Sequence, residues 1–171
     1  MKVAFIMDEM FEDSEFRIPF ERVREAGHEP VIVGLESGKK VTGKNGEETV
    51  TTEVAVADVS AGEFDGLVIP GGYSPDKIRT DGKMVELTRN IVGAGKPVAA
   101  ICHAGWMLAE ADVIKGKTVT SWPSIKTDLV NAGAKWVDQE VAEDGNIITS
   151  RKPDDLEAFS KAFLVQLEQQ S

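Results

Sequence analysis

Short apolar runs alternate with segments of helical period along the whole chain, and this alternation limits the fold more than any other feature. Four β-branched runs have the composition of buried strands: Lys2–Met7, Glu29–Leu35, Asp65–Pro70 and Pro97–Cys102. Apolar residues recur at helical spacing in three segments: Phe16, Phe20 and Val23; Met84, Leu87 and Ile91; Leu156, Phe159, Phe163 and Leu167. Strands that alternate with helices predict an α/β fold, a mostly parallel sheet with helices on both faces.

The remaining segments fit around this core. Residues 37–48 are rich in Gly and Lys and contain Asn45-Gly46, which predicts a hairpin or an exposed excursion. A helix is expected over Ser124–Asn131, ending at Gly133, followed by short strands within residues 134–138, 139–144 and 146–150. The last helix opens with Pro153 and two aspartates, as the helix dipole favours.

Composition narrows the class of protein. The chain has 171 residues, 42% of them hydrophobic, which suits one domain over residues 1–171. A single cysteine cannot form an internal disulfide, the apolar start is too short for a signal peptide, and no run of 18 apolar residues occurs. We therefore expect a cytoplasmic protein outside the membrane. A net charge of −10 argues against nucleic-acid binding through a broad basic face.

Three predicted strand ends carry residues suited to chemistry. Glu12 follows the first strand, Gly71-Gly72 the third, and Cys102-His103 the fourth. Ligands of open α/β sheets bind beyond the carboxyl ends of the strands. This edge is therefore the predicted site.

Cys102 stands between a strand and a segment of helical composition. Small residues follow at Ala104 and Gly105, so strand and helix can pack closely, as in a nucleophile elbow, although the formal G-x-S-x-G pattern is absent. Unpaired N–H groups at a helix start favour the thiolate, so we expect a lowered pKa for Cys102. A lone cysteine is more often a small buried hydrophobic residue, but the strand-to-helix junction favours the reactive interpretation.

His103 has more than one interpretation. Its backbone N–H is placed to be an oxyanion donor. Its side chain is either structural or a general base, and neighbouring side chains on a turn usually point apart. The other histidine, His28, lies on a different turn, and no C-x-x-C or H-x-x-x-H spacing occurs, so no metal site is expected.

The other candidates are open to two interpretations each. Gly71 and Gly72 form either an ordinary turn or a site where backbone N–H groups approach a substrate oxygen. Asp76 either caps a helix or orients a histidine. Glu12 is either an acid placed at the helix start because the helix dipole stabilises it there, or a catalytic group. In the second case it is protonated in a partly buried pocket and donates a hydrogen bond to a thiolate.

Four stretches together resemble the PfpI (ThiJ-type) family, the intracellular-protease branch of the superfamily that includes the parkinsonism-associated deglycase. They are FED after the first strand, VIPGGYSPDKIR, PVAAICHAGWMLAEADVIKGKTVTSW and TSRKPDDLEAF. The resemblance runs from Lys2 to the last helix. It implies a flavodoxin-like three-layer sandwich related to class I glutamine amidotransferases, no cofactor, and homodimers that sometimes build hexamers.

The resemblance also implies roles for the candidate residues. Cys102 would be the elbow nucleophile and Glu12 the protonated acid beside it, while Gly72 and His103 would supply oxyanion N–H groups. In the protease branch the His103 side chain pairs with an acidic residue of a neighbouring subunit. Asp76 occupies that place, where some members carry the longer Glu.

Three functions follow from the same thiol. The favoured one is a glyoxalase or deglycase acting on a small aldehyde such as methylglyoxal, or on a glycated amino acid or protein, through a hemithioacetal. The second is an intracellular cysteine peptidase. The third is a stress protein that senses oxidation through sulfinic acid at Cys102.

Overall fold

A seven-stranded sheet forms the centre of the computed structural model, which describes residues 1–170. The strand order is β10-β11-β7-β6-β1-β2-β5. The strands are β1 (Lys2–Ile6), β2 (Glu29–Gly34), β5 (Val54–Ala55), β6 (Gly66–Ile69), β7 (Val98–Ile101), β10 (Ala142–Asp144) and β11 (Ile147–Ser150). All neighbours pair in parallel except β10, which is antiparallel to β11. The predicted mostly parallel sheet is confirmed.

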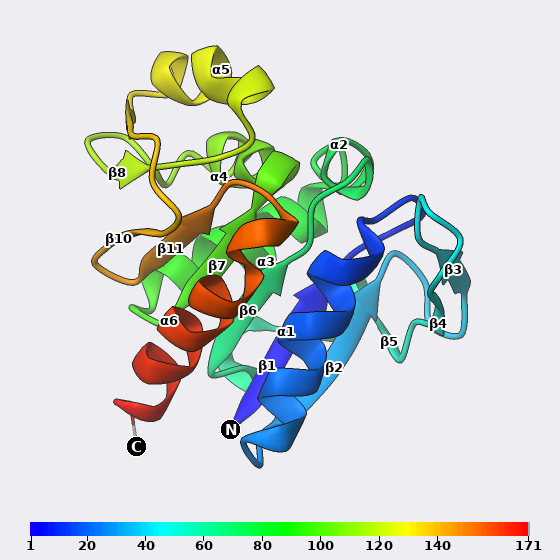
Figure 1. Cartoon of the computed structure of the whole chain (residues 1–171). Helices are drawn as coiled ribbons and strands as arrows, with labels where there is room; N and C mark the ends of the chain where they lie inside the picture. Colours follow the sequence, from blue (N-terminus) through cyan, green and yellow to red (C-terminus); the bar gives the residue numbers. More distant parts are fainter. Residues whose placement is uncertain (171) are drawn as a thin grey trace.

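Helices cover both faces of this sheet. Those of more than one turn are α1 (Asp13–Glu25), α2 (Ser74–Ile78), α3 (Gly82–Gly93), α4 (Gly105–Glu110), α5 (Lys126–Asn131) and α6 (Leu156–Glu168). Short 3₁₀ turns are η1 (Val56–Asp58), η2 (Ala61–Glu63), η3 (Cys102–Ala104), η4 (Pro123–Ile125) and η5 (Pro153–Asp155). Helices α1 and α6 lie side by side in front of the sheet, and the start of β1 and the end of α6 lie at its lower edge (Figure 1).

Alternate residues of the strands supply two separate cores. Val3 and Phe5 of β1 pack with residues of α1 and α6, such as Phe159. Ala4 and Ile6 face the opposite side, where the residues of α3 and α4 pack. Successive strand residues point to opposite faces, so a strand buried on both sides must be apolar throughout. This is why the strands read as continuous apolar runs.

Two smaller sheets extend the domain. Strands β3 (Lys40–Thr42) and β4 (Thr49–Thr51) form an antiparallel hairpin, so the hairpin predicted around Asn45-Gly46 is confirmed. Strands β8 (Thr118–Val119) and β9 (Lys135–Trp136) pair in parallel. The three-layer α/β sandwich places the carboxyl ends of β1, β6 and β7 at one edge. No helix within residues 1–170 has the length and apolar character needed to cross a bilayer.

Candidate active site

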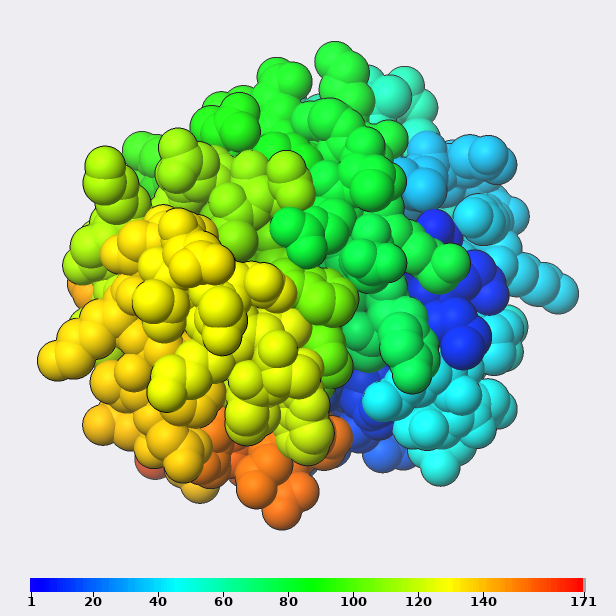
Figure 2. All heavy atoms as spheres, turned by 90° about the horizontal axis from the view of Figure 1, so that it is seen from above, coloured from blue at the N-terminus to red at the C-terminus, as the bar shows by residue number. Residues whose placement is uncertain are grey.

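A pocket of about 290 Å³ opens at the carboxyl edge of the sheet. Its lining residues are Glu12, Glu15, Lys44, Cys102, His103, Trp122 and Pro153. Figure 2 looks onto this edge, where the dark-blue amino-terminal, cyan, green and orange segments of the chain converge. Four distant parts of the sequence therefore meet in one small cavity, as expected at the strand ends of an α/β sheet.

Cys102 is the first residue of η3, the 3₁₀ turn that joins β7 to α4. Its φ is +62°, a left-handed conformation that residues other than glycine seldom adopt. A strained backbone of this kind persists only where the surrounding structure holds it, and such positions cluster at functional sites. The predicted strand-to-helix elbow is confirmed, and it presents the sulfur to the pocket with 8% of the residue exposed.

Two backbone N–H groups point at the Cys102 sulfur, those of Gly72 and His103. Gly72 has φ +82°, and a Cβ there would lie 2.5 Å from the backbone nitrogen of Glu12. Only glycine therefore fits this close approach. Gly71 differs, because its N–H donates to Glu15 Oε1 at 2.9 Å and is already engaged within the protein.

Glu15 is the carboxyl group that lies against the thiol, and it is fully buried. Burial, and then the charge of Glu12, raise the pKa of Glu15 to about 8. A side-chain hydrogen bond with Cys102 is among the interactions that oppose this rise. Among residues 1–170 the buried Oε2 atom finds no hydrogen-bond partner. At neutral pH Glu15 therefore holds a proton beside the sulfur.

The pKa of the Cys102 thiol is raised to about 12, by burial first and by the charge of Glu15 second. The expected lowering is wrong, because burial of the sulfur and the charge of Glu15 outweigh the N–H donors that the elbow supplies. The N–H groups of His103 and Gly72, and the charge of Lys44, work in the lowering direction. Because a charged Glu15 contributes to the rise, a protonated Glu15 leaves a thiol that ionises more readily.

Glu12 also lines the pocket but makes different contacts. Its Oε2 lies 2.9 Å from Lys44 Nζ, and its Oε1 accepts a hydrogen bond from Asn45 Nδ2 at 3.0 Å. The structure thus places Glu12 in an ion pair and places Glu15, one helical turn further on, beside Cys102. The sequence carried a signal for this, because Glu15, Pro19 and Val23 recur every four residues on the buried face of α1.

His103 contacts the nucleophile directly. Its Nδ1 lies 3.2 Å from Cys102 Sγ, although neighbouring side chains were expected to point apart. Its Nε2 lies 3.2 Å from Ser124 Oγ, and its ring centroid is 5.1 Å from that of Trp106. Burial, and then the charge of Lys44, lower the pKa of His103, so the ring is neutral at pH 7 and can accept a proton.

Asp76 lies on α2 with an exposed side chain and does not line the pocket. Within one chain the partner of His103 Nε2 is Ser124. Contact between Asp76 and a neighbouring subunit's histidine stays a prediction. Sequence reasoning also missed Lys44, Ser124 and Trp122, because only folding of their loops brings them to the strand ends. Within residues 1–170, no cluster of three or more His, Cys, Asp or Glu side chains is placed to hold a metal ion.

Comparison with known proteins gives consistent results over nearly the whole chain. The sequence model of the DJ-1/PfpI family matches residues 1–166. YraA of Bacillus subtilis, provisionally named as a cysteine protease, is 47% identical over 95% of this chain and 96% of its own. Protein/nucleic acid deglycase 2 of Escherichia coli is 46% identical over 95% of each chain. General stress protein 18 of Bacillus subtilis is 42% identical over 98% of each chain.

A solved structure agrees. A two-domain protein from Anabaena variabilis, with DJ-1/ThiJ/PfpI-like and ferritin-like domains, superimposes with a TM-score of 0.96 and 40% identity. The match covers 98% of this chain and 48% of that one. The relatives of this chain that are named deglycase or cysteine protease are named as enzymes. With a family match over residues 1–166 and an elbow cysteine at the edge of the sheet, the chain belongs to the DJ-1/PfpI family.

Proposed function

We propose that the chain is a cofactor-independent enzyme that converts methylglyoxal, or the early adducts methylglyoxal forms with amino groups and thiols, to lactate. The observation that carries the proposal is the buried Glu15 carboxyl group held against the Cys102 thiol in a pocket of about 290 Å³. A thiolate attacks an aldehyde carbon readily, and a neighbouring acid is needed to protonate the oxygen. A cavity of this size suits a three-carbon carbonyl compound.

The proposed reaction begins at the sulfur. Cys102 Sγ gives its proton to His103 Nδ1, 3.2 Å away, and attacks the aldehyde carbon. A C–S bond forms and the carbonyl oxygen takes a proton from Glu15, which gives a hemithioacetal. The proton on that carbon then moves to the neighbouring carbon through an enediol, with Glu15 or His103 as the base and acid. This step produces a thioester of lactate. Water cleaves the thioester, releases lactate and returns the thiol, so methylglyoxal and water together give lactate.

An amino-group adduct enters the same sequence. Its carbinol carbon is attacked by the thiolate, the C–N bond breaks, and the amine leaves with a proton from an acid in the pocket. The N–H groups of Gly72 and His103 that face the sulfur are suited to stabilise a negatively charged oxygen on the attacked carbon. His103, held between Cys102 and Ser124, is suited to carry the proton to the departing amine.

The test is loss of methylglyoxal and formation of lactate by the purified protein. Wild type should produce one lactate for each methylglyoxal consumed, and Cys102→Ser should lose at least about 100-fold of the rate, since a neutral hydroxyl is a far weaker nucleophile. Circular dichroism of the variant controls for folding. Lactate formation by Cys102→Ser at the wild-type rate would end the proposal.

Peptidase activity is the second candidate, favoured by the protease name of the 47% identical relative. The same thiol would attack a peptide carbonyl, but the cavity of about 290 Å³ around it is small for an extended peptide. A fluorogenic peptide should then be cleaved by wild type and spared by Cys102→Ala. Cleavage that separates from the protein on a sizing column would count against it.

A further inference from the structure

The loop of residues 43–48, between β3 and β4, folds around one carboxylate. Asp13, the first residue of α1, is 1% exposed. Its Oδ1 accepts the N–H of Asn45 at 2.8 Å, and its Oδ2 accepts those of Glu47 and Glu48 at 2.9 Å each. Burial alone would raise the pKa of Asp13, but these N–H groups lower it overall, so the carboxylate stays charged.

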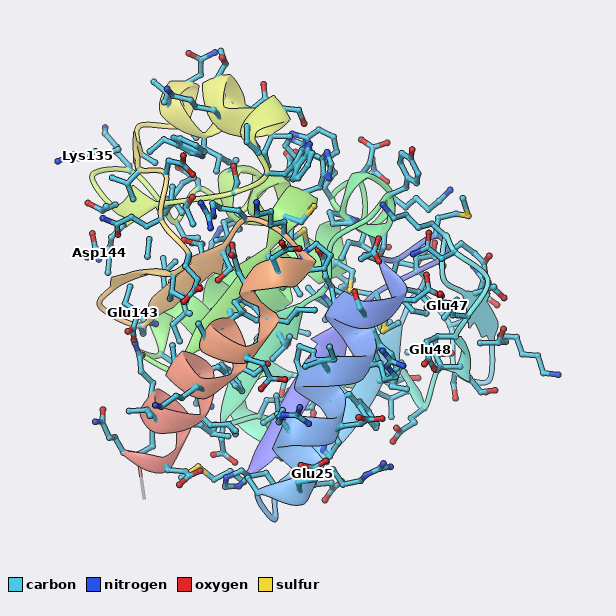
Figure 3. The ribbon with its side chains drawn as sticks, in the orientation of Figure 1. Glu25, Glu47, Glu48, Lys135, Glu143 and Asp144 are labelled. Atoms are coloured by element: carbon cyan, nitrogen blue, oxygen red, sulfur yellow. The ribbon has the colours of Figure 1, made fainter. Side chains whose placement is uncertain are left out.

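The fit between the loop and α1 is close. A Cβ at Gly43 would collide with the Asp13 carboxylate, so only glycine allows the loop to approach it. The N–H of Lys44 donates to the carbonyl of Phe11 at 2.8 Å, and Glu48 Oε1 lies 3.7 Å from Arg17 Nε on α1. Figure 3 shows Glu47 and Glu48 at the hairpin beside α1. The loop is therefore anchored at several points rather than free.

This anchoring delivers Lys44 to the pocket. Its Nζ lies 2.9 Å from Glu12 Oε2 and 5.9 Å from the centroid of the Tyr73 ring. Asn45, the next residue, donates to the other oxygen of Glu12 at 3.0 Å. Lys44 is the one cationic side chain among the residues that line the pocket with Cys102.

We propose that Lys44, held in place by the Asp13-anchored loop, is the positioning residue that sets the pH at which the Cys102–Glu15 pair ionises. The proposal rests on the proposed function only in taking Cys102 as the reactive thiol. Lys44 lies in the loop between β3 and β4, far in the sequence from Cys102 at the elbow.

The physical basis is the weak screening of charge in a buried site. A cation near a buried acid stabilises the charged form, and charge is screened less around a buried carboxyl group than in bulk water. The titratable groups that line the pocket with the pair are Glu12, His103 and Lys44. Glu12 opposes ionisation of Glu15, whereas Lys44 lowers the pKa of both Glu15 and Cys102. Removal of the Lys44 charge must therefore move ionisation of the pair to higher pH.

The test measures alkylation of Cys102 by iodoacetamide as a function of pH. Lys44→Gln should move the profile to higher pH, and a midpoint that rises by about one pH unit makes alkylation below it about tenfold slower. Lys44→Arg should keep most of the wild-type profile. Lys39→Gln is the matched control, because Lys39 Nζ also pairs with an acid, Asp8 at 3.0 Å, and has similar exposure, but lies outside the pocket lining.

Asp13→Asn tests the anchor. An amide has only one acceptor oxygen for the three N–H groups, so the loop should loosen and the profile should move in the same direction as for Lys44→Gln. The double variant should move no further than Lys44→Gln alone, because both changes act through one cation. If Asp13→Asn does not fold, comparison of the alkylation profiles of Lys44→Gln and Lys39→Gln still tests the role of Lys44.

Two results would overturn the proposal. One is a Lys44→Gln profile that overlies wild type, and the other is an equal displacement of the profile in Lys39→Gln. A wild-type profile for Asp13→Asn would overturn the part assigned to the anchor. Alkylation needs no methylglyoxal turnover, so failure of the proposed enzyme activity would leave this test unaffected.

Discussion

Cys102 and Glu15 share one buried environment, and their protons come off in succession. The pKa of Glu15 is raised to about 8 and that of Cys102 to about 12, with burial as the main cause for both. Groups this close titrate as a pair, and once the first proton has left, repulsion between the two charges holds the second. The pair therefore carries one negative charge, which lies on either the thiol or the carboxyl group. This suits a nucleophile that has an acid beside it.

Glu15→Gln should simplify the titration of the thiol. The amide carries no charge, so the second cause of the raised pKa disappears and Cys102 should titrate in one step at a pKa below about 12. Alkylation by iodoacetamide across pH measures this step. Glu25→Gln on the same helix, with the side chain 65% exposed, is the surface control. A thiol midpoint at about 12 or above in Glu15→Gln would show that the carboxylate does not act on the sulfur.

Cys102, Glu15 and Lys44 differ in how much of their role the sequence reveals. Cys102 could be placed because its neighbours in the sequence determine the elbow. Glu15 could have been preferred over Glu12 from the period of α1, since it shares a buried face with Pro19 and Val23. Lys44 could not be found, because its position depends on contacts between a distant hairpin and Asp13.

Elements were easier to predict than contacts between their loops. The long apolar strands and the helices with three or more inward residues are confirmed, because burial leaves a clear period in the sequence. Strand β5, Val54–Ala55, was missed because two residues are too short to show any period. Phe20, expected on the inner stripe of α1, is only half-buried. Phe20 still packs on the inner face, with its ring centroid 5.4 Å from that of Phe5, and the buried Pro19 lies beside it in the sequence.

The turn after β6 contains Gly72, whose backbone lies close to the backbone of Glu12 at the site. Gly72→Ala should destabilise the fold by more than the about 1 to 2 kcal/mol typical of a left-handed non-glycine residue, because its Cβ would also strike the Glu12 backbone. Gly38→Ala is the control, with φ +75° and open space around its Cβ. Urea unfolding followed by circular dichroism compares them. Equal losses of unfolding free energy in the two variants would show that contact between the new Cβ and the Glu12 backbone does not destabilise the fold.

The whole molecule carries a net charge of −10, yet one lysine reaches the pocket. Asp76 lies outside that pocket on an exposed surface, which suits contact with another copy of the chain. We propose a homodimer, on the resemblance to the protease branch, in which Asp76 pairs with His103 of a neighbouring subunit. Asp76 would then contact His103 Nε2 either together with Ser124 Oγ or in place of it.

Dilution tests this assembly. If Asp76 completes the site of a neighbour, turnover per chain should fall as sedimentation shows the oligomer dissociating. Asp76→Asn at high concentration should then turn over at the rate of diluted wild type. Full turnover by a single-chain species would contradict the shared site.

We propose that Glu15, and not Glu12, is the acid that works with Cys102. The direct measurement is kcat/KM for lactate formation from methylglyoxal by Glu15→Gln and Glu12→Gln. We predict a loss of about 100-fold or more in Glu15→Gln and a clearly smaller loss in Glu12→Gln, since general acid–base groups typically contribute that much. A larger loss in Glu12→Gln, or wild-type activity in Glu15→Gln, would contradict it.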